Sequence, residues 1–245
     1  MRVLALAALC LPYVHAQDQR RVLSPDGQVE LRLFIGLPDG AVLNCLAYHL
    51  WWHGKPVLDT SYLGLHIHFQ EPLLGENVGL SNDRALHGSG YNGIFADYLQ
   101  TSTTGRRIQL EARVYNDGVA FRYTVPQSPL LVNLLLEDDV SQFYFAHESA
   151  ARPEHTALPY IEQEPGPVWV GIYAEDVPGF PRMQLARWDA HLMSAHLPDK
   201  PHDPGVAYEV RTPWTSPWHI IALGGSREAV AQSAVVHDLA SAKDR

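Results

Sequence analysis

The sequence predicts an all-β fold, an antiparallel sandwich or barrel. Short runs in which apolar and polar residues alternate recur along the chain, and this period of two is the pattern of half-buried strands. Turn-forming residues separate the runs, since the 245 residues include 18 glycines and 18 prolines. Many short strands at such spacing are typical of antiparallel sandwiches and barrels. The predicted strands cover residues 28–35, 41–52, 64–69, 107–115, 119–125, 168–174, 183–196, 206–211 and 219–223.

The chain begins with the layout of a cleaved secretory signal over residues 1–16. Arg2 precedes an apolar run, and Ala16 stands at the expected cleavage position. We therefore expect an exported protein, periplasmic or secreted, whose single domain covers residues 17–245. Removal of the signal also removes one of the two cysteines, which leaves Cys45 without an intrachain disulfide partner.

The mature chain is acidic and lacks a membrane-spanning pattern. The whole chain carries a formal charge of −9, and loss of Arg2 with the signal makes the mature charge −10. Nucleic-acid binding depends on clustered Lys and Arg that displace counterions from phosphates, so a nucleic-acid partner is not expected. No stretch after the signal approaches the roughly 18 apolar residues needed to cross a bilayer.

The clearest local element is a hairpin over residues 113–126, RVYNDGVAFRYTVP. Asp117-Gly118 is a type I′ turn signal, and a turn at these residues would place apolar pairs on one face of the two strands. The same register sets Arg113 opposite Arg122 on the other face. Like charges in that position are unfavourable, so we expect a bridging carboxylate, either from this chain or from a partner or ligand.

Three segments lack a clear strand pattern. Residues 71–105 are only weakly periodic and predict a long loop, which serves either a function or an interdomain contact. Residues 197–205 predict a shorter loop within a strand pair. One helix is expected over residues 226–242, because Ser226 can cap its first turn and Glu228 follows in that turn.

The hairpin and three further motifs together resemble a known domain. RVYNDGVAFRYTVP is similar to the signature of the N-terminal domain of glycoside hydrolase family 97, which includes exo-acting α-glucosidases and α-galactosidases. SPDGQVELRL (24–33), HGKPVLDTSYLGLHI (53–67) and SPWHIIALGG (216–225) resemble its opening strand, second hairpin and closing strand. The four motifs stand in the family's order, and the resemblance extends over nearly the whole mature chain.

The resemblance implies an antiparallel β-super-sandwich of the galactose-mutarotase-like type, with one short C-terminal helix. In that family this domain packs on a catalytic (β/α)8 barrel, which carries the catalytic carboxylates. We therefore expect no catalytic residues here, and a chain that supplies pocket wall and interdomain contacts to a catalytic barrel absent from this chain. Either the barrel is encoded separately or the chain is a gene fragment. The expected ligand is a carbohydrate of the α-glucoside or α-galactoside class. A freestanding carbohydrate-binding module and a mutarotase-like enzyme are the alternatives.

The resemblance also implies a calcium ligand, with one departure from the family pattern. The family's glutamate lies in a motif like I-x-E-A-x-L, where this chain has Ile172-Tyr173-Ala174-Glu175-Asp176-Val177. Glutamate and alanine are exchanged, and one step along a strand moves a side chain to the opposite face. We expect no cofactor on the chain alone, and calcium held by Glu175 and Asp176 only together with a barrel, since calcium needs six to eight oxygens.

The remaining candidate contacts to carbohydrate or to a barrel are Arg113, Arg122, Trp52 and Glu162. Trp51 and Trp52 are adjacent and point to opposite faces of a strand, so one belongs to the core and the other is free to stack on a sugar.

Two pairs of histidines are further candidates for a site. His66 and His68 share a strand face, but no third metal ligand is identifiable, which favours solvent-facing side chains. His191 and His196 lie on opposite faces of a continuous strand, which disfavours a mutarotase-like pair.

Overall fold

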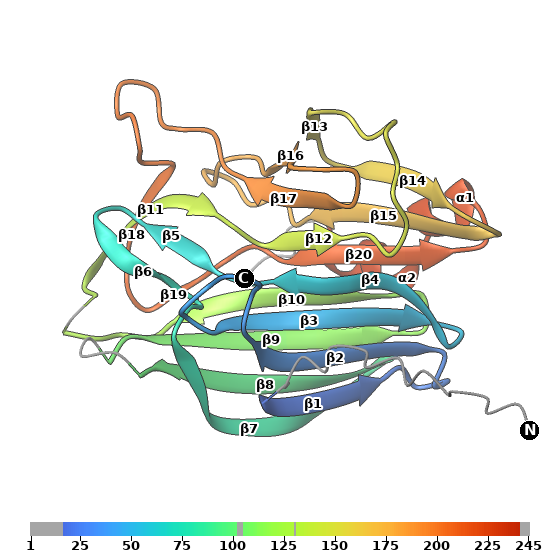
Figure 1. Cartoon of the computed structure of the whole chain (residues 1–245), viewed down its shortest axis with the longest axis horizontal. Helices are drawn as coiled ribbons and strands as arrows, with labels where there is room; N and C mark the ends of the chain where they lie inside the picture. The colour runs from blue at the N-terminus through green and yellow to red at the C-terminus, as the bar shows by residue number, and fades with distance from the viewer. Residues whose placement is uncertain (1–16, 102–104, 130, 241–245) are drawn as a thin grey trace, which may run out of the picture.

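The computed structural model describes residues 17–101, 105–129 and 131–240. The expected signal, residues 1–16, lies outside the described residues. Within them the fold is all-β and antiparallel, as the alternating runs predict (Figure 1).

A large sheet forms one layer of the molecule. Its neighbouring strands run in the order β14, β15, β20, β10, β9, β8 and β7, and the short strand β19 also pairs with β10. These strands are β7 (Val78–Gly88), β8 (Tyr91–Gln100), β9 (Arg107–Tyr115), β10 (Gly118–Val125), β14 (Tyr160–Glu164), β15 (Val168–Ala174), β19 (Trp214–Thr215) and β20 (His219–Gly224).

Three smaller sheets make up the second layer. The first, β1-β2-β3-β4, lies across β7–β10 in Figure 1 and contacts β8, β9 and β10. Its strands are β1 (Gln17–Leu23), β2 (Val29–Gly36), β3 (Cys45–Trp52) and β4 (Lys55–Tyr62). The second, β18-β11-β5-β6, consists of β5 (Leu65–Ile67), β6 (Gln70–Leu74), β11 (Asn133–Asp139) and β18 (Tyr208–Arg211). The third, β12-β17-β16-β13, consists of β12 (Gln142–Tyr144), β13 (His155–Ala157), β16 (Gln184–Arg187) and β17 (Leu192–His196).

The main core lies between the two layers. It draws buried apolar side chains from all four sheets, because alternate residues of each strand point inward. Examples are Leu33, Leu46, Val114, Phe121, Leu136 and Met193.

The expected short helical segment near the C-terminus covers the outer face of the large sheet. It is divided into α1 (Arg227–Ala231) and α2 (Ala234–Leu239), and the Ser226 hydroxyl caps α1 by accepting a hydrogen bond from Ala229 N at 3.1 Å. The helices bury Val230 and Val235 against β10, β15 and β20 in a second apolar cluster.

The hairpin of β9 and β10 is present, but its predicted register is wrong. Tyr115 pairs with Gly118, so the turn is Asn116-Asp117, and Arg122 lies opposite Glu111. Two contacts explain the shift. A Cβ atom on Gly118 would lie 2.3 Å from the Ile221 carbonyl oxygen, so this glycine is required where β10 passes close to β20. The Asp117 carboxylate accepts a hydrogen bond from Ala234 N at 2.5 Å and so caps α2.

The predicted loop over residues 71–105 is wrong, because most of it forms β6, β7 and β8. β7 is the edge strand of the large sheet and exposes most of its side chains, so it lacks an alternating pattern. The predicted loop over residues 197–205 is present, but the strands beside it do not pair: β17 and β18 belong to different sheets.

Candidate functional site

The two hairpin arginines share one carboxylate from their own chain. Nη2 of Arg113 lies 2.8 Å from Oε1 of Glu111, and Nη2 of Arg122 lies 2.7 Å from Oε2. Both guanidinium groups also lie over the ring of Trp218, at 4.6 and 4.4 Å from its centroid. Burial alone raises the pKa of Glu111, but the two guanidinium groups outweigh it and the pKa is lowered. The bridging carboxylate is therefore internal and ionised.

A pocket of about 290 Å³ lies where β15 ends and β20 begins. Asp139 and His219, both buried, line it, together with the exposed side chains of Asp176 and Arg182. Its apolar lining includes Leu158, Pro159, Phe180, Pro181, Met183 and Leu197. A mostly apolar pocket with a few polar groups is the usual form of a small-molecule site, and this one is at the lower end of the size range.

Glu175 and Asp176 occupy different positions at this pocket. Glu175 is buried, its backbone N donates to Trp218 O at 2.9 Å, and its Oε2 accepts from Trp218 N at 3.2 Å. Asp176 is exposed, and its backbone N donates to Ala240 O at 3.0 Å. In the described part of the chain, no three His, Cys, Asp or Glu side chains are placed to hold a metal ion.

Asp139 and His219 form a buried pair that links the two layers. Nε2 of His219 lies 2.7 Å from Oδ2 of Asp139, while Oδ1 of Asp139 accepts hydrogen bonds from Ser141 N at 2.9 Å and Ser141 Oγ at 2.5 Å. Burial favours the neutral acid, but His219 and Ser141 outweigh it, and the pKa of Asp139 is lowered. The carboxylate is therefore charged inside the core.

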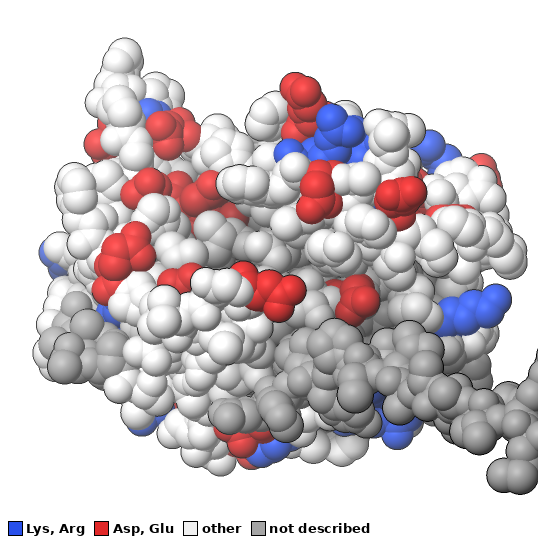
Figure 2. Space-filling model, viewed as in Figure 1, with Lys and Arg blue, Asp and Glu red and all other residues white. Residues whose placement is uncertain are grey.

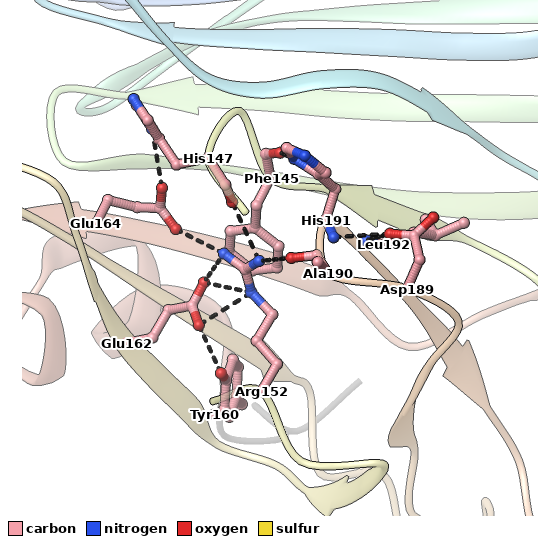
Figure 3. A network of polar contacts seen from close by, with 10 residues as sticks. All are labelled: Phe145, His147, Arg152, Tyr160, Glu162, Glu164, Asp189, Ala190, His191 and Leu192. Atoms are coloured by element: carbon pink, nitrogen blue, oxygen red, sulfur yellow. Dashed lines mark hydrogen bonds and ion pairs between the residues drawn. The ribbon is translucent and has the colours of Figure 1, made fainter. Parts of the chain in front are cut away.

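Glu162 belongs to a different network, centred on the buried Arg152 (Figure 3). Arg152 Nη2 lies 2.6 Å from Oε1 of Glu162 and 2.9 Å from Oε1 of Glu164, and the Tyr160 hydroxyl donates to Glu162 Oε2 at 2.6 Å. Two carboxyl groups thus face one guanidinium. Burial, and then a hydrogen bond with Glu162, raise the pKa of Glu164 to about 8, so this acid keeps its proton at neutral pH.

We expect the free energy of unfolding to fall as pH rises through about 8, because of Glu164. Its pKa is raised above the ordinary 4.5 in the folded state, so its stabilising contribution is complete below about 4.5 and disappears as the folded state loses the proton. Urea unfolding between pH 5 and pH 9.5 measures this. Glu164→Gln is expected to flatten the decline, and an unchanged slope in that variant would contradict the assignment.

Trp52, the tryptophan candidate, belongs neither to the pocket at β15 and β20 nor to the Arg152 network. Trp52 is partly buried and packs against the main core, whereas the neighbouring Trp51 lies under the Arg32 guanidinium, 4.2 Å from its ring centroid. One tryptophan of the adjacent pair is thus associated with the core, and the other is covered by a cation.

The first pair of histidines shares one partner, and the second pair has two separate partners. His66 and His68 both approach Glu137 of β11, with Nδ1 to carboxylate distances of 3.5 and 2.9 Å. His191 Nδ1 is 2.9 Å from Phe145 O, and His196 Nδ1 is 2.8 Å from an Asp138 oxygen.

A second, wider hollow of about 650 Å³ lies between β4 and β12. Its lining includes Asp39, Asp59 and Glu76 and no Lys, Arg or His. Figure 2 shows acidic side chains along the middle of this face and few basic ones, so a phosphate backbone would be repelled from it.

Sequence reasoning missed Glu111, Asp139, His219 and Arg152. Glu111 had a usable signal, because it stands two residues before Arg113 and therefore on the same strand face. Asp139 and His219 are 80 residues apart, and no local pattern connects them.

Comparison with solved structures shows similarity to family 97 glycosidases. A family 97 enzyme from Pseudoalteromonas sp. strain K8 in complex with acarbose matches with a TM-score of 0.71 and 16% identity, over 89% of this chain and 38% of that one. A variant of the family 97 enzyme from this strain, in complex with panose, gives a TM-score of 0.70. A β-arabinopyranosidase matches with a TM-score of 0.64 and 17% identity, over 85% of this chain and 40% of that one.

The chain therefore spans about two fifths of the length of these enzymes. No curated protein matches it significantly. No helix among the described residues is long and apolar enough to span a membrane.

The family model for the glycosyl-hydrolase 97 N-terminal domain matches residues 22–156, which is more than half of the chain and includes the β9–β10 hairpin. The chain belongs to the glycosyl-hydrolase 97 N-terminal family.

Proposed function

We propose that this chain is a non-catalytic domain of a family 97-like glycosidase and completes the active-site wall of a catalytic barrel. The observation that carries the proposal is that the chain matches an N-terminal family model and only 38% of the length of a family 97 enzyme. The proposed ligands are α-glucosides or α-galactosides. The proposed location is periplasmic or secreted, because the first 16 residues have the layout of a signal peptide.

The pocket at the ends of β15 and β20 is the part of the surface that we assign to the barrel contact. Asp176 and Arg182 are exposed beside it, and an acidic and a basic group side by side can pair with complementary charges on a partner. Asp176 would also be available to a calcium ion shared with the barrel, whereas the Glu175 carboxylate already binds Trp218 N. Calcium titration by calorimetry should give heat for the complex and none for the chain alone.

The test is reconstitution with the family 97 barrel segment encoded in the same genome. The two polypeptides, separately tagged and co-expressed, should elute together and hydrolyse a nitrophenyl α-glycoside, whereas this chain alone should not. Asp176→Ala with Arg182→Ala should reduce co-elution, and the matched surface variant Lys55→Ala on β4 should not. Separate elution of the two polypeptides, or turnover by this chain alone, would refute the proposal.

A freestanding carbohydrate-binding module is the second candidate function. It is favoured by one observation, which is that Nδ1 of the buried His219, a residue that lines the pocket, lacks a hydrogen-bond partner in the described residues. Calorimetry of the isolated chain with maltose and methyl galactosides tests this function. Binding of either sugar would support a carbohydrate-binding module, and the absence of binding would support a purely structural role.

A further inference from the structure

The pocket at the ends of β15 and β20 contains a buried histidine nitrogen that lacks a partner. His219 is 3% exposed and lines the pocket, and its Nδ1 has no hydrogen-bond partner among the described residues. Buried polar atoms are nearly always paired in folded proteins. Nε2 donates to the ionised Asp139, and the ring stacks on Phe121 at 4.6 Å, which holds it in place. In the neutral imidazole, Nδ1 is therefore an acceptor and requires a donor.

The charges that line the pocket favour a cationic donor. With His219 neutral, the lining carries three acidic residues, Asp139, Glu175 and Asp176, and one basic residue, Arg182. Asp176 is exposed, so its carboxylate is accessible to a charge that enters the pocket. An anion would be repelled, whereas a lysine ammonium group is attracted and has donors only. A lysine side chain therefore meets both the charge of the pocket and the need of Nδ1.

The chain itself provides a basic segment at the edge of this pocket. Ala240 lines the pocket, and its carbonyl oxygen accepts a hydrogen bond from Asp176 N at 3.0 Å. Residues 241–245, with the sequence SAKDR, follow directly and lie outside the described residues. Lys243 is three residues beyond Ala240, so an extended backbone carries its Cα up to about 10 Å from that point. The pocket is therefore within reach of the Lys243 ammonium group.

We propose that residues 241–245 occupy this pocket, with the Lys243 ammonium group donating to Nδ1 of His219 and forming an ion pair with Asp176. The volume of about 290 Å³ suits one long side chain and its backbone, and not a folded element of a partner. The pocket is thus a binding site for a short basic segment of the same chain. This contact does not rest on the proposed function. Its consequence does, because the segment would compete with a catalytic barrel for the same surface.

The first test is carbodiimide cross-linking of the full chain, which joins an ammonium group to a carboxylate in contact with it. The chain contains only three lysines, so few products are expected. Lys200 lies 3.7 Å from Glu209 and serves as the positive control. Mass spectrometry should identify a Lys243–Asp176 link in a yield comparable to that of the control. The control link without a Lys243–Asp176 link would overturn the proposal, and so would equal yields between Lys243 and carboxylates far from the pocket.

The second test follows the His219 Nδ1 resonance of the full chain labelled with 15N-histidine, at pH 8, which is above the ordinary pKa of an imidazole. Lys243→Gln should shift this resonance. Arg245→Gln, which removes the same charge two residues further on, should not. His191, whose Nδ1 lies 2.9 Å from Phe145 O, should be unchanged in both variants.

Two results of the resonance experiment would overturn the proposal. One is an absent shift in Lys243→Gln, or a shift of the same size in Arg245→Gln. The other is saturable binding of methyl α-glucoside at His219 in the wild type, because the pocket would then be open to a neutral ligand.

Reconstitution with the barrel is a separate measurement. Lys243→Gln should increase co-elution with the barrel, because it frees the shared surface. A Lys243–Asp176 link without co-elution in either form would refute the proposed function and leave this inference standing. Co-elution without the link would refute this inference and leave the proposed function standing.

Discussion

Replacing Arg152 with alanine is expected to lower the free energy of unfolding by about 3–5 kcal/mol, because it removes one partner of a buried ion-pair network. The Arg152 side chain is only 1% exposed and binds both Glu162 and Glu164. It also donates to the carbonyl oxygens of His147 and Ala190, so it holds two loops against β14. Without the guanidinium, two carboxyl groups remain in a buried site with no cation. Urea unfolding at pH 7 measures the loss.

The control for this change is Arg107→Ala, at a partly exposed ion pair. Arg107 is 40% exposed and lies 2.6 Å from Asp97, and pairs of this kind contribute about 0–1 kcal/mol. Equal losses in the free energy of unfolding of the two variants would show that burial of the Arg152 network adds nothing to the stability of the fold. Mutation of Arg152 to lysine should restore part of the stability, because the charge returns without the two-pronged geometry of the guanidinium.

Replacing Asp139 with alanine is expected to cost a similar amount, about 3–5 kcal/mol, for the same reason. It would leave Nε2 of His219 and the backbone N of Ser141 without their acceptor in the core. The variant should also lose a characteristic pH dependence. The pKa of Asp139 is lowered in the folded state, so its contribution is present above the ordinary 3.8 and is lost as pH falls below it.

The pH series for Asp139→Ala is measured between pH 7 and pH 2.5 by thermal or urea unfolding. The wild type should lose stability more steeply than the variant below about pH 3.8. Asp59→Ala is the surface control, because Asp59 is 59% exposed and pairs with His49 only at 3.4 Å, so a change of about 0–1 kcal/mol is expected. Parallel acid profiles for wild type and Asp139→Ala would contradict the assigned role.

These buried charges explain why the candidate sites were harder to predict than the strands. Strand positions follow from alternation between adjacent residues, and this local pattern located most of β2, β3, β9, β10, β15 and β20. Charge pairing follows from which strands become neighbours. Glu162 was selected from the sequence, but its partner Arg152 lies on a connecting segment and carries no periodic signal.

The β9–β10 hairpin shows where local reasoning reaches its limit. The alternation placed the apolar side chains of both strands on the core face, and they are buried there, because a register error of two residues keeps the same face inward. The turn itself was displaced by contacts with β20 and α2, which are far away in the sequence. Within the hairpin, therefore, the face was predictable and the register was not.

The sequence by itself determined the all-β class, the hairpin at residues 113–126 and the resemblance to the family 97 N-terminal domain, because all three are carried by short contiguous patterns. Only the tertiary structure decided that Glu111 joins Arg113 to Arg122, that residues 71–105 form strands, and that Asp139 meets His219 beside a pocket. The physical reason is distance along the chain. Hydrogen bonds and ion pairs between layers depend on how the sheets pack, and that packing is a property of the whole core.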